Sequence, residues 1–241
     1  MKTQQFVIAQ YSRDDSLQSY IQITLQGLWK EEKEVFAKFV PQYGRILDLG
    51  CGTGRVAFNL ATDGEILACD IVPAMIDTAN ALKPKFANQP KFSVQDGRQM
   101  SYPDAYFDIV IFAYNGVNTV PGRINRERIF AEVNRVLKDD GTFIFASHVR
   151  NFWKRPCHWI IRFFQTIFKT SEHIKEFGDN INEKYGRAQY INIPSHSDIV
   201  RLVDTAGFKI VEEIPTDNTN HQDGVVTPPR GTSIFVCKKA F

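Results

Sequence analysis

Three glycines at alternate positions follow a short apolar run in the first quarter of the chain. Residues 46–49 predict a buried strand, and residues 56–60 have helical character. Between them lie Gly50, Gly52 and Gly54. Glycine permits backbone angles that other residues resist, and it lets a ligand lie directly against the main chain. The free N–H groups at the helix start face such a ligand, so this stretch predicts a ligand-binding loop.

The glycine spacing separates two kinds of cofactor. The dinucleotide fingerprint is G-x-G-x-x-G, and it cannot be drawn through Gly50 because position 55 is Arg. The chain has D-x-G-x-G-x-G from Asp48, which resembles motif I of the class I S-adenosylmethionine (SAM)-dependent methyltransferases. The resemblance implies that the loop holds the methionine part of SAM and that Asp48 helps orient its amino group; a turn without a ligand is the alternative. The loop residues expected to bind SAM are Asp48, Gly50, Cys51, Gly52, Thr53 and Gly54.

Two further acids stand at the ends of the next predicted strands. Asp70 lies about 20 residues past the glycines, where a carboxylate can accept hydrogen bonds from the ribose of either NAD or SAM. Its alternative role is a simple helix cap. For Asp96-Gly97 the resemblance implies contacts to the adenine amine and a ring nitrogen, whereas a plain turn is the alternative. Ile71 and Met75 are expected to flank the adenine.

The order of elements predicts an α/β fold. The stretch 106–113, with its apolar run, predicts a strand buried on both faces of a parallel sheet. It ends at Tyr114 and Asn115, which we expect near the reacting methyl because ligands sit beyond the carboxyl ends of such strands. The resemblance implies a Rossmann-like, seven-stranded, mostly parallel sheet flanked by helices, with the last strand antiparallel and a helical insertion.

Three parts are predicted along the chain. Residues 1–40 form an N-terminal helical cap, and the family resemblance implies that it closes over the cofactor; its candidate contacts are Tyr11, Tyr20 and Trp29, with packing on the sheet as the alternative. Residues 41–147 and 196–241 form the SAM-binding core. Residues 148–195 form the insertion, interpreted mainly as a lid over the substrate site. Its aromatic and basic part, 152–169, also suits peripheral contact with a membrane or stacking on bases.

The totals describe an ordinary globular chain. It has 241 residues, 43% hydrophobic and 23% charged, and a net charge of +2 that is too mild to imply nucleic acid. The four cysteines are scattered without a C-x-x-C pair, so a disulfide framework or a zinc site is not expected. The N-terminus lacks the apolar core of a signal peptide, and no apolar run reaches the roughly 18 residues of a membrane span. We therefore expect a cytoplasmic protein.

The acceptor side is less constrained than the cofactor side. His148 is the best candidate for a general base, because it follows the strand 142–147 directly and histidine titrates in the useful range; capping the insertion is the alternative. The motif Asn115-Gly116-Val117 argues against a DNA amino-methyltransferase, and no metal-ligand cluster is evident. A small molecule is the first choice of substrate, followed by a lipid or quinone-like substrate at a membrane surface and then RNA. No oligomeric state is indicated.

Three function classes follow from these features. The first is a SAM-dependent methyltransferase, an enzyme that transfers methyl groups by in-line displacement. The second is a noncatalytic SAM-binding module that acts through partners, which is motivated by the absence of an assignable catalytic residue. The third is an NAD-linked dehydrogenase, and the glycine spacing argues against it.

Overall fold

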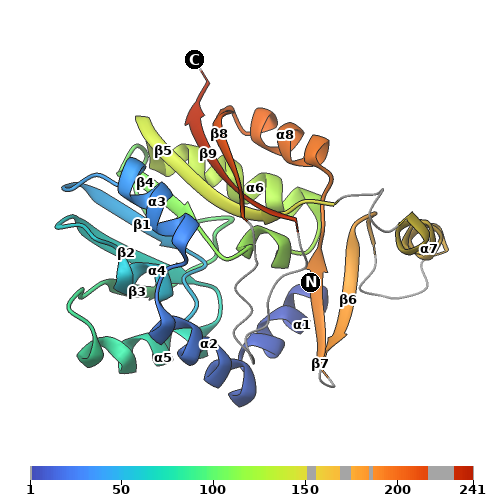
Figure 1. The fold of residues 1–241 in the computed structure, drawn as a ribbon, viewed down its shortest axis with the longest axis horizontal. Coiled ribbons are helices and arrows are strands. Elements are labelled where there is room, and N and C mark those ends of the chain that lie inside the picture. Colours follow the sequence, from blue (N-terminus) through green and yellow to red (C-terminus); the bar gives the residue numbers. More distant parts are fainter. Residues whose placement is uncertain (1, 151–155, 169–174, 185–186, 217–230, 241) are drawn as a thin grey trace.

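A seven-stranded sheet forms the centre of the protein (Figure 1). The computed structural model describes residues 2–150, 156–168, 175–184, 187–216 and 231–240. The strand order is β3-β2-β1-β4-β5-β9-β8, in which β9 pairs antiparallel with both neighbours and the other pairs are parallel. The predicted Rossmann-like fold is thereby confirmed. The strands are β1 (Arg45–Leu49), β2 (Glu65–Asp70), β3 (Lys91–Val94), β4 (Phe107–Phe112), β5 (Leu137–His148), β8 (Phe208–Thr216) and β9 (Thr232–Lys239).

Apolar side chains on both faces of the central strands hold helices against the sheet. On one face, Phe130 and Val203 bring α6 (Arg123–Val136) and α8 (His196–Thr205) into the cluster that contains Leu47. On the other face, α3 (Lys30–Phe39), α4 (Arg55–Asn59) and α5 (Pro73–Leu82) join the cluster of Ile46. The neighbouring residues Ile46 and Leu47 of β1 thus pack on opposite faces of the sheet, because successive side chains of a strand point to opposite sides. Two short 3-10 helices complete the core, η1 (Lys83–Lys85) and η2 (Gly116–Thr119).

Residues 2–39 lie in the segment predicted as a cap and form three helices: α1 (Lys2–Tyr11), α2 (Asp14–Gln26) and α3 (Lys30–Phe39). Buried polar contacts hold α2 and α3 on the glycine loop. The Thr24 and Thr53 hydroxyls share a 2.6 Å hydrogen bond. The guanidinium of Arg55 donates to both carboxylate oxygens of Glu32, at 2.5 and 2.6 Å. The cap is therefore joined to the loop by side chains and not only by the connecting chain.

The insertion contains a helix, as predicted, and also a β-hairpin that the sequence analysis did not expect. It contains α7 (Pro156–Ile167) and an antiparallel hairpin of β6 (Asp179–Lys184) and β7 (Arg187–Asn192). Buried Asp179 organises the base of the hairpin, because it accepts hydrogen bonds from the Tyr190 hydroxyl (2.6 Å) and the Asn192 amide (2.9 Å). In Figure 1, α7 projects beyond this hairpin at the margin of the molecule. Residues 152–155 and 169 of the aromatic-basic segment lie outside the described residues.

Candidate active site

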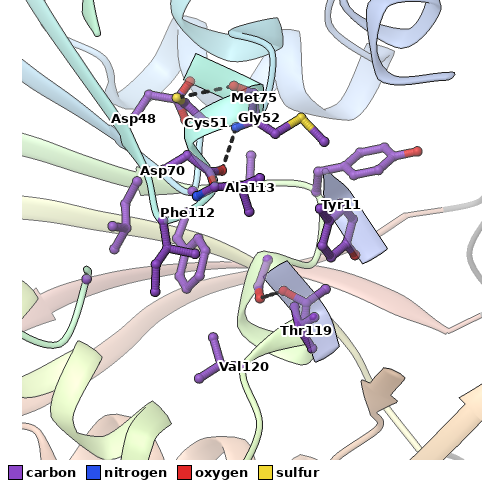
Figure 2. Close-up of a pocket in the computed structure, with 18 of the residues that line it drawn as sticks. Tyr11, Asp48, Cys51, Gly52, Asp70, Met75, Phe112, Ala113, Thr119 and Val120 are labelled. Carbon is purple, nitrogen blue, oxygen red and sulfur yellow. Dashed lines mark hydrogen bonds between the residues drawn. The ribbon is translucent and has the colours of Figure 1, made fainter. Parts of the chain in front are cut away.

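A cavity lies at the carboxyl ends of β1, β2 and β4, where the cap meets the sheet. The empty space counted there is about 1210 Å³, a figure that includes space open to solvent at the mouth. In the view of Figure 2, Asp48, Cys51 and Gly52 lie on one side, and Thr119 and Val120 lie on the opposite side. The predicted cofactor residues that line it are Asp48, Gly50, Cys51, Gly52, Thr53, Asp70, Ile71, Met75, Asp96, Gly97 and Tyr114.

The three glycines of the loop have backbone angles that favour glycine. Their φ angles are +63° at Gly50, +53° at Gly52 and +90° at Gly54. A Cβ on Gly50 would meet the Phe112 ring at 2.7 Å, whereas a Cβ on Gly52 would have only Tyr20 nearby, at 3.5 Å. Gly54 is the N-cap of α4 and does not line the cavity; a Cβ there would lie 2.7 Å from Phe58. Gly54 therefore serves packing, whereas a Cβ at Gly52 would make only an ordinary van der Waals contact with Tyr20.

Asp48 reaches from β1 to the first turn of α4. Its Oδ2 accepts a hydrogen bond from the Ala57 N–H at 3.0 Å. The side chain is buried, and burial raises the pKa of this carboxyl to about 7. A carboxylate can accept several hydrogen bonds, and a cation beside it would lower that pKa again. The site therefore suits a positively charged amine.

Asp70 links the ends of two strands. Its Oδ2 accepts from the Gly52 N–H and its Oδ1 from the Val72 N–H, both at 2.9 Å. Val72, and not Asp70, is the N-cap residue of α5, so the simple capping role does not apply. Burial raises the pKa of Asp70. The carboxylate fixes the glycine loop while lining the cavity, and its remaining lone pairs suit ribose hydroxyls.

Asp96 lines the cavity in an ion pair with Arg98. The Arg98 Nε lies 2.9 and 3.0 Å from the two carboxylate oxygens, and the Arg98 backbone N–H also donates to Asp96. Despite some desolvation, these bonds lower the pKa of Asp96. Asp96 therefore stays ionised, and its position is set by Arg98, a neighbour that the sequence analysis did not single out.

Three tyrosines from three elements converge on the cavity. Tyr11 from α1 packs on Tyr20 from α2 with centroids 5.7 Å apart, and Tyr20 lies 5.9 Å from Tyr114. Burial raises the pKa of all three phenols, that of Tyr114 to about 12, so they are neutral at ordinary pH. Trp29 does not line the cavity; it packs on Tyr114 at 5.1 Å and under the Arg55 guanidinium at 4.8 Å.

Besides Gly54, two further predicted site residues lie away from the cavity wall. Asn115 is buried with φ +57°, and its Oδ1 has no hydrogen-bond partner within the part of the chain that the structure describes. His148 lies buried in the β5–β9 ladder, where its Nδ1 is 2.9 Å from the Thr232 hydroxyl, and burial lowers its pKa to about 4. The structure does not bring His148 to the cavity, because β5 continues through residue 148 and places its side chain beside Thr232 of the neighbouring strand β9.

Some lining residues were missed by sequence reasoning. Gln4, Val7 and Ile8 place α1 against the cavity, and Thr119 and Val120 come from η2 and the residue after it. The apolar run 6–9 with Tyr11 was a signal for an inward face of α1. No comparable signal marked η2. The described residues of the insertion do not line the cavity, so no contact among them supports the interpretation of the insertion as a lid.

Comparisons with known proteins agree with this fold and site. A family profile described as "Methyltransferase domain" matches residues 47–145. "Putative methyltransferase YqeM" of Bacillus subtilis is 34% identical over 111 residues, 45% of this chain and 44% of that protein. "Uncharacterized protein MJ1252" of Methanocaldococcus jannaschii is 33% identical over 194 residues, covering 78% and 71% of the two chains. The match to the Bacillus protein thus spans less than half its length.

The solved structures give the same fold. A SAM-dependent methyltransferase from Methanosarcina mazei superposes with a TM-score of 0.71 and 19% identity, covering 89% of this chain and 99% of that one. Residues 47–145 belong to the methyltransferase-domain family, and the fold is that of the class I SAM-dependent methyltransferases. SAM is the cofactor that this membership implies, and the buried carboxylate, the open glycine loop and the second strand-end acid fit its amine, chain and ribose.

Proposed function

We propose that this protein is a methyltransferase that transfers a methyl group from SAM to a small organic molecule. The observation that carries the proposal is the joining of Asp48, the glycine loop and Asp70 around one cavity that also has a tyrosine-lined side. When bound, SAM supplies a methyl group on a positively charged sulfur, and transfer is a displacement in line with the nucleophile. Holding the two reactants close and aligned supplies much of the rate in such a reaction.

The residues of this chain act in that reaction by binding and orientation. Asp48 holds a cationic amine, Asp70 holds hydroxyls, and Gly52 lets the ligand lie against the backbone. The faces of Tyr11, Tyr20 and Tyr114 favour a nearby cation. Histidine is absent from the described residues that line the cavity, and the lining phenols are neutral. An acceptor that is already nucleophilic therefore suits this site better than one that must first lose a proton.

The acceptor side of the cavity favours a partly apolar molecule. Val7 and Ile8 face it from α1, and Val120 faces it from beyond η2. Tyr11 and Thr119 contribute hydroxyl groups to the same wall. Related proteins bear names with acceptors of this kind: "2-phytyl-1,4-naphtoquinone methyltransferase" of Synechococcus elongatus is 27% identical over 161 residues, 64% of either chain. A small molecule with an apolar body and one polar reactive end fits these observations.

The proposal is tested by incubating the purified chain with methyl-labelled SAM and a fractionated metabolite extract. We expect label in a small-molecule fraction. Asp70→Asn should abolish most of it, because a lost charge-assisted hydrogen bond contributes about 1.5–3 kcal/mol, which corresponds to roughly 10- to 100-fold in affinity. Asp77→Asn is the matched control, since Asp77 is exposed on α5 and outside the cavity.

Calorimetry with S-adenosylhomocysteine, the demethylated product of SAM, separates the alternatives. Binding without label transfer across broad extracts would support a noncatalytic SAM-binding module instead. Binding of NADH and not of S-adenosylhomocysteine would overturn the cofactor assignment. Equal binding by Asp70→Asn and the parent would show that Asp70 does not contact the ribose.

A further inference from the structure

Helix α7 exposes a continuous set of large apolar side chains. Ile161, Phe164, Ile167 and Phe168 are 51–71% exposed, and Ile160 is nearly half exposed. The helical repeat places these residues on one face, because Phe164, Ile167 and Phe168 follow Ile160 at four, seven and eight positions, and Phe164 and Phe168 follow Ile161 at three and seven. Scattered single apolar residues are ordinary on a protein surface, but a grouped set of this kind marks an interaction site.

The opposite side of α7 is anchored to the protein. Trp159 is buried and packs against the Arg150 guanidinium at 5.3 Å and the Phe177 ring at 6.2 Å. The described residues of α7 take no part in lining the cavity. The exposed face is therefore neither the anchor of the helix nor the wall of the active site.

The sequence of this segment has charge of one sign. Between positions 151 and 171 it has four cations, at 154, 155, 162 and 169, and no Asp or Glu. Since the whole chain is +2, the rest of it has 25 cations against 27 anions and is net negative. On α7 itself, Arg162 lies off the apolar face and donates to the Gln165 side chain at 3.0 Å. The segment thus combines an apolar face with flanking positive charge.

We propose that α7 is a membrane-docking helix that lies flat in the interface of an anionic lipid bilayer. An apolar face with cations beside it inserts between acyl chains while the cations meet lipid phosphates. The described helices include none that is long and apolar enough to cross a bilayer, which agrees with docking on the surface. A symmetric contact between two copies of α7 would bring the two cationic segments together, so charge favours an anionic surface over a second copy.

Vesicle co-sedimentation of the full chain tests this assignment, and it does not depend on methyl transfer. Vesicles of phosphatidylcholine with phosphatidylglycerol are compared with phosphatidylcholine alone, at low and at high salt. We expect binding to the anionic vesicles at low salt and weaker binding at high salt. Phe164→Glu should reduce partitioning about tenfold or more, since a buried phenylalanine contributes more than the 1.4 kcal/mol that corresponds to tenfold. Ile124→Glu is the control, because Ile124 is a 62% exposed apolar residue on α6.

The other occupants of this face give distinct results. Absence of binding to anionic vesicles at low salt would overturn the proposal. The proposal would also be overturned if light scattering showed a dimer without lipid and if Phe164→Glu dissociated that dimer. A second copy of the chain would then cover the face. A third outcome is that the parent does not bind vesicles and that Phe164→Glu has a lower thermal midpoint of unfolding than Ile124→Glu. That result would show that another part of the chain covers the exposed face of α7.

Discussion

The two walls of the cavity are built in different ways. The cofactor wall consists of strand ends and the loops that follow them, and its contacts join residues close in sequence or paired in one sheet, such as Asp70 and Gly52, 18 positions apart. The cap wall depends on contacts over much longer separations. The Gln189 side chain donates to the Tyr11 hydroxyl, 178 positions away, and the Tyr190 N–H donates to the Gln10 side chain across 180 positions, each at 3.3 Å.

This difference indicates how the two halves of the site can change. A wall fixed by parallel strands and by glycine backbone angles tolerates little substitution, which suits the binding of an unchanging cofactor. A wall assembled from α1, η2 and the hairpin behind them can change shape without disturbing the sheet. We therefore expect substitutions in the cofactor wall to abolish binding, and substitutions that loosen the cap to affect stability first.

The largest effect is expected within the glycine loop. Gly52→Ala should reduce binding of S-adenosylhomocysteine about 100-fold, because the added methyl group would occupy cavity space that the ligand needs, while left-handed strain costs only about 1–2 kcal/mol of folding stability. Gly50→Ala should lower the free energy of unfolding more, since its methyl group would clash with the buried Phe112 ring at 2.7 Å. Calorimetry and urea unfolding measure the two quantities.

Gly207→Ala is the control for strain alone. Gly207 has φ +75° after the end of α8 and does not line the cavity. It should lose stability like Gly52→Ala but keep the parent's affinity for S-adenosylhomocysteine. Parent-like binding by Gly52→Ala would mean that the ligand does not lie on the glycine loop.

The cap should be the next most sensitive region. Glu32→Gln leaves the buried Arg55 guanidinium without its anionic partner, and breaking a buried ion pair costs about 3–5 kcal/mol. Urea unfolding should show this loss, and the double variant Glu32→Gln/Arg55→Met should recover part of it. Glu34→Gln is the control, because Glu34 pairs with Lys30 at the surface of the same helix at 4.0 Å and should leave stability unchanged. A Glu32→Gln protein as stable as the parent would show that the pair does not hold the cap.

The same difference explains which features the sequence predicted. The glycine spacing, Asp48 and Asp70 are local signals, since each lies at the end of a short apolar run with a clear period. They identified the sheet, the cofactor wall and the family. The prediction that the last strand is antiparallel came from the family resemblance and not from the periodicity of the sequence.

Features that depend on distant contacts were not predicted. The hairpin β6–β7 depends on buried Asp179, whose partners Tyr190 and Asn192 gave no pattern in sequence. His148 was expected at the mouth of the crevice, but β5 extends one residue further and pairs it with Thr232. The bidentate ion pair of Glu32 and Arg55 also could not be predicted, because no sequence pattern links two residues 23 positions apart in this way.

The smallest expected effect is the pH dependence of cofactor binding, and it also tests the cofactor wall. The pKa of Asp48 is about 7 in the folded protein, against 3.8 when unperturbed. A cationic amine binds the ionised form, so affinity should fall about tenfold from about pH 8 to about pH 6. Calorimetry with S-adenosylhomocysteine measures this change. 5′-Methylthioadenosine, which lacks the amine, should bind equally at both values, and Asp48→Asn should lose the dependence.

Stability without ligand should follow the opposite trend. Because the folded-state pKa of Asp48 is raised, its contribution to stability is fully present below about pH 4 and is lost as pH rises toward about 7. Bound S-adenosylhomocysteine should reduce that loss, since its amine favours the carboxylate. If affinity for S-adenosylhomocysteine and for 5′-methylthioadenosine changed with pH in parallel, Asp48 would not hold the amine, and its bond to Ala57 would be its whole role at the cofactor wall.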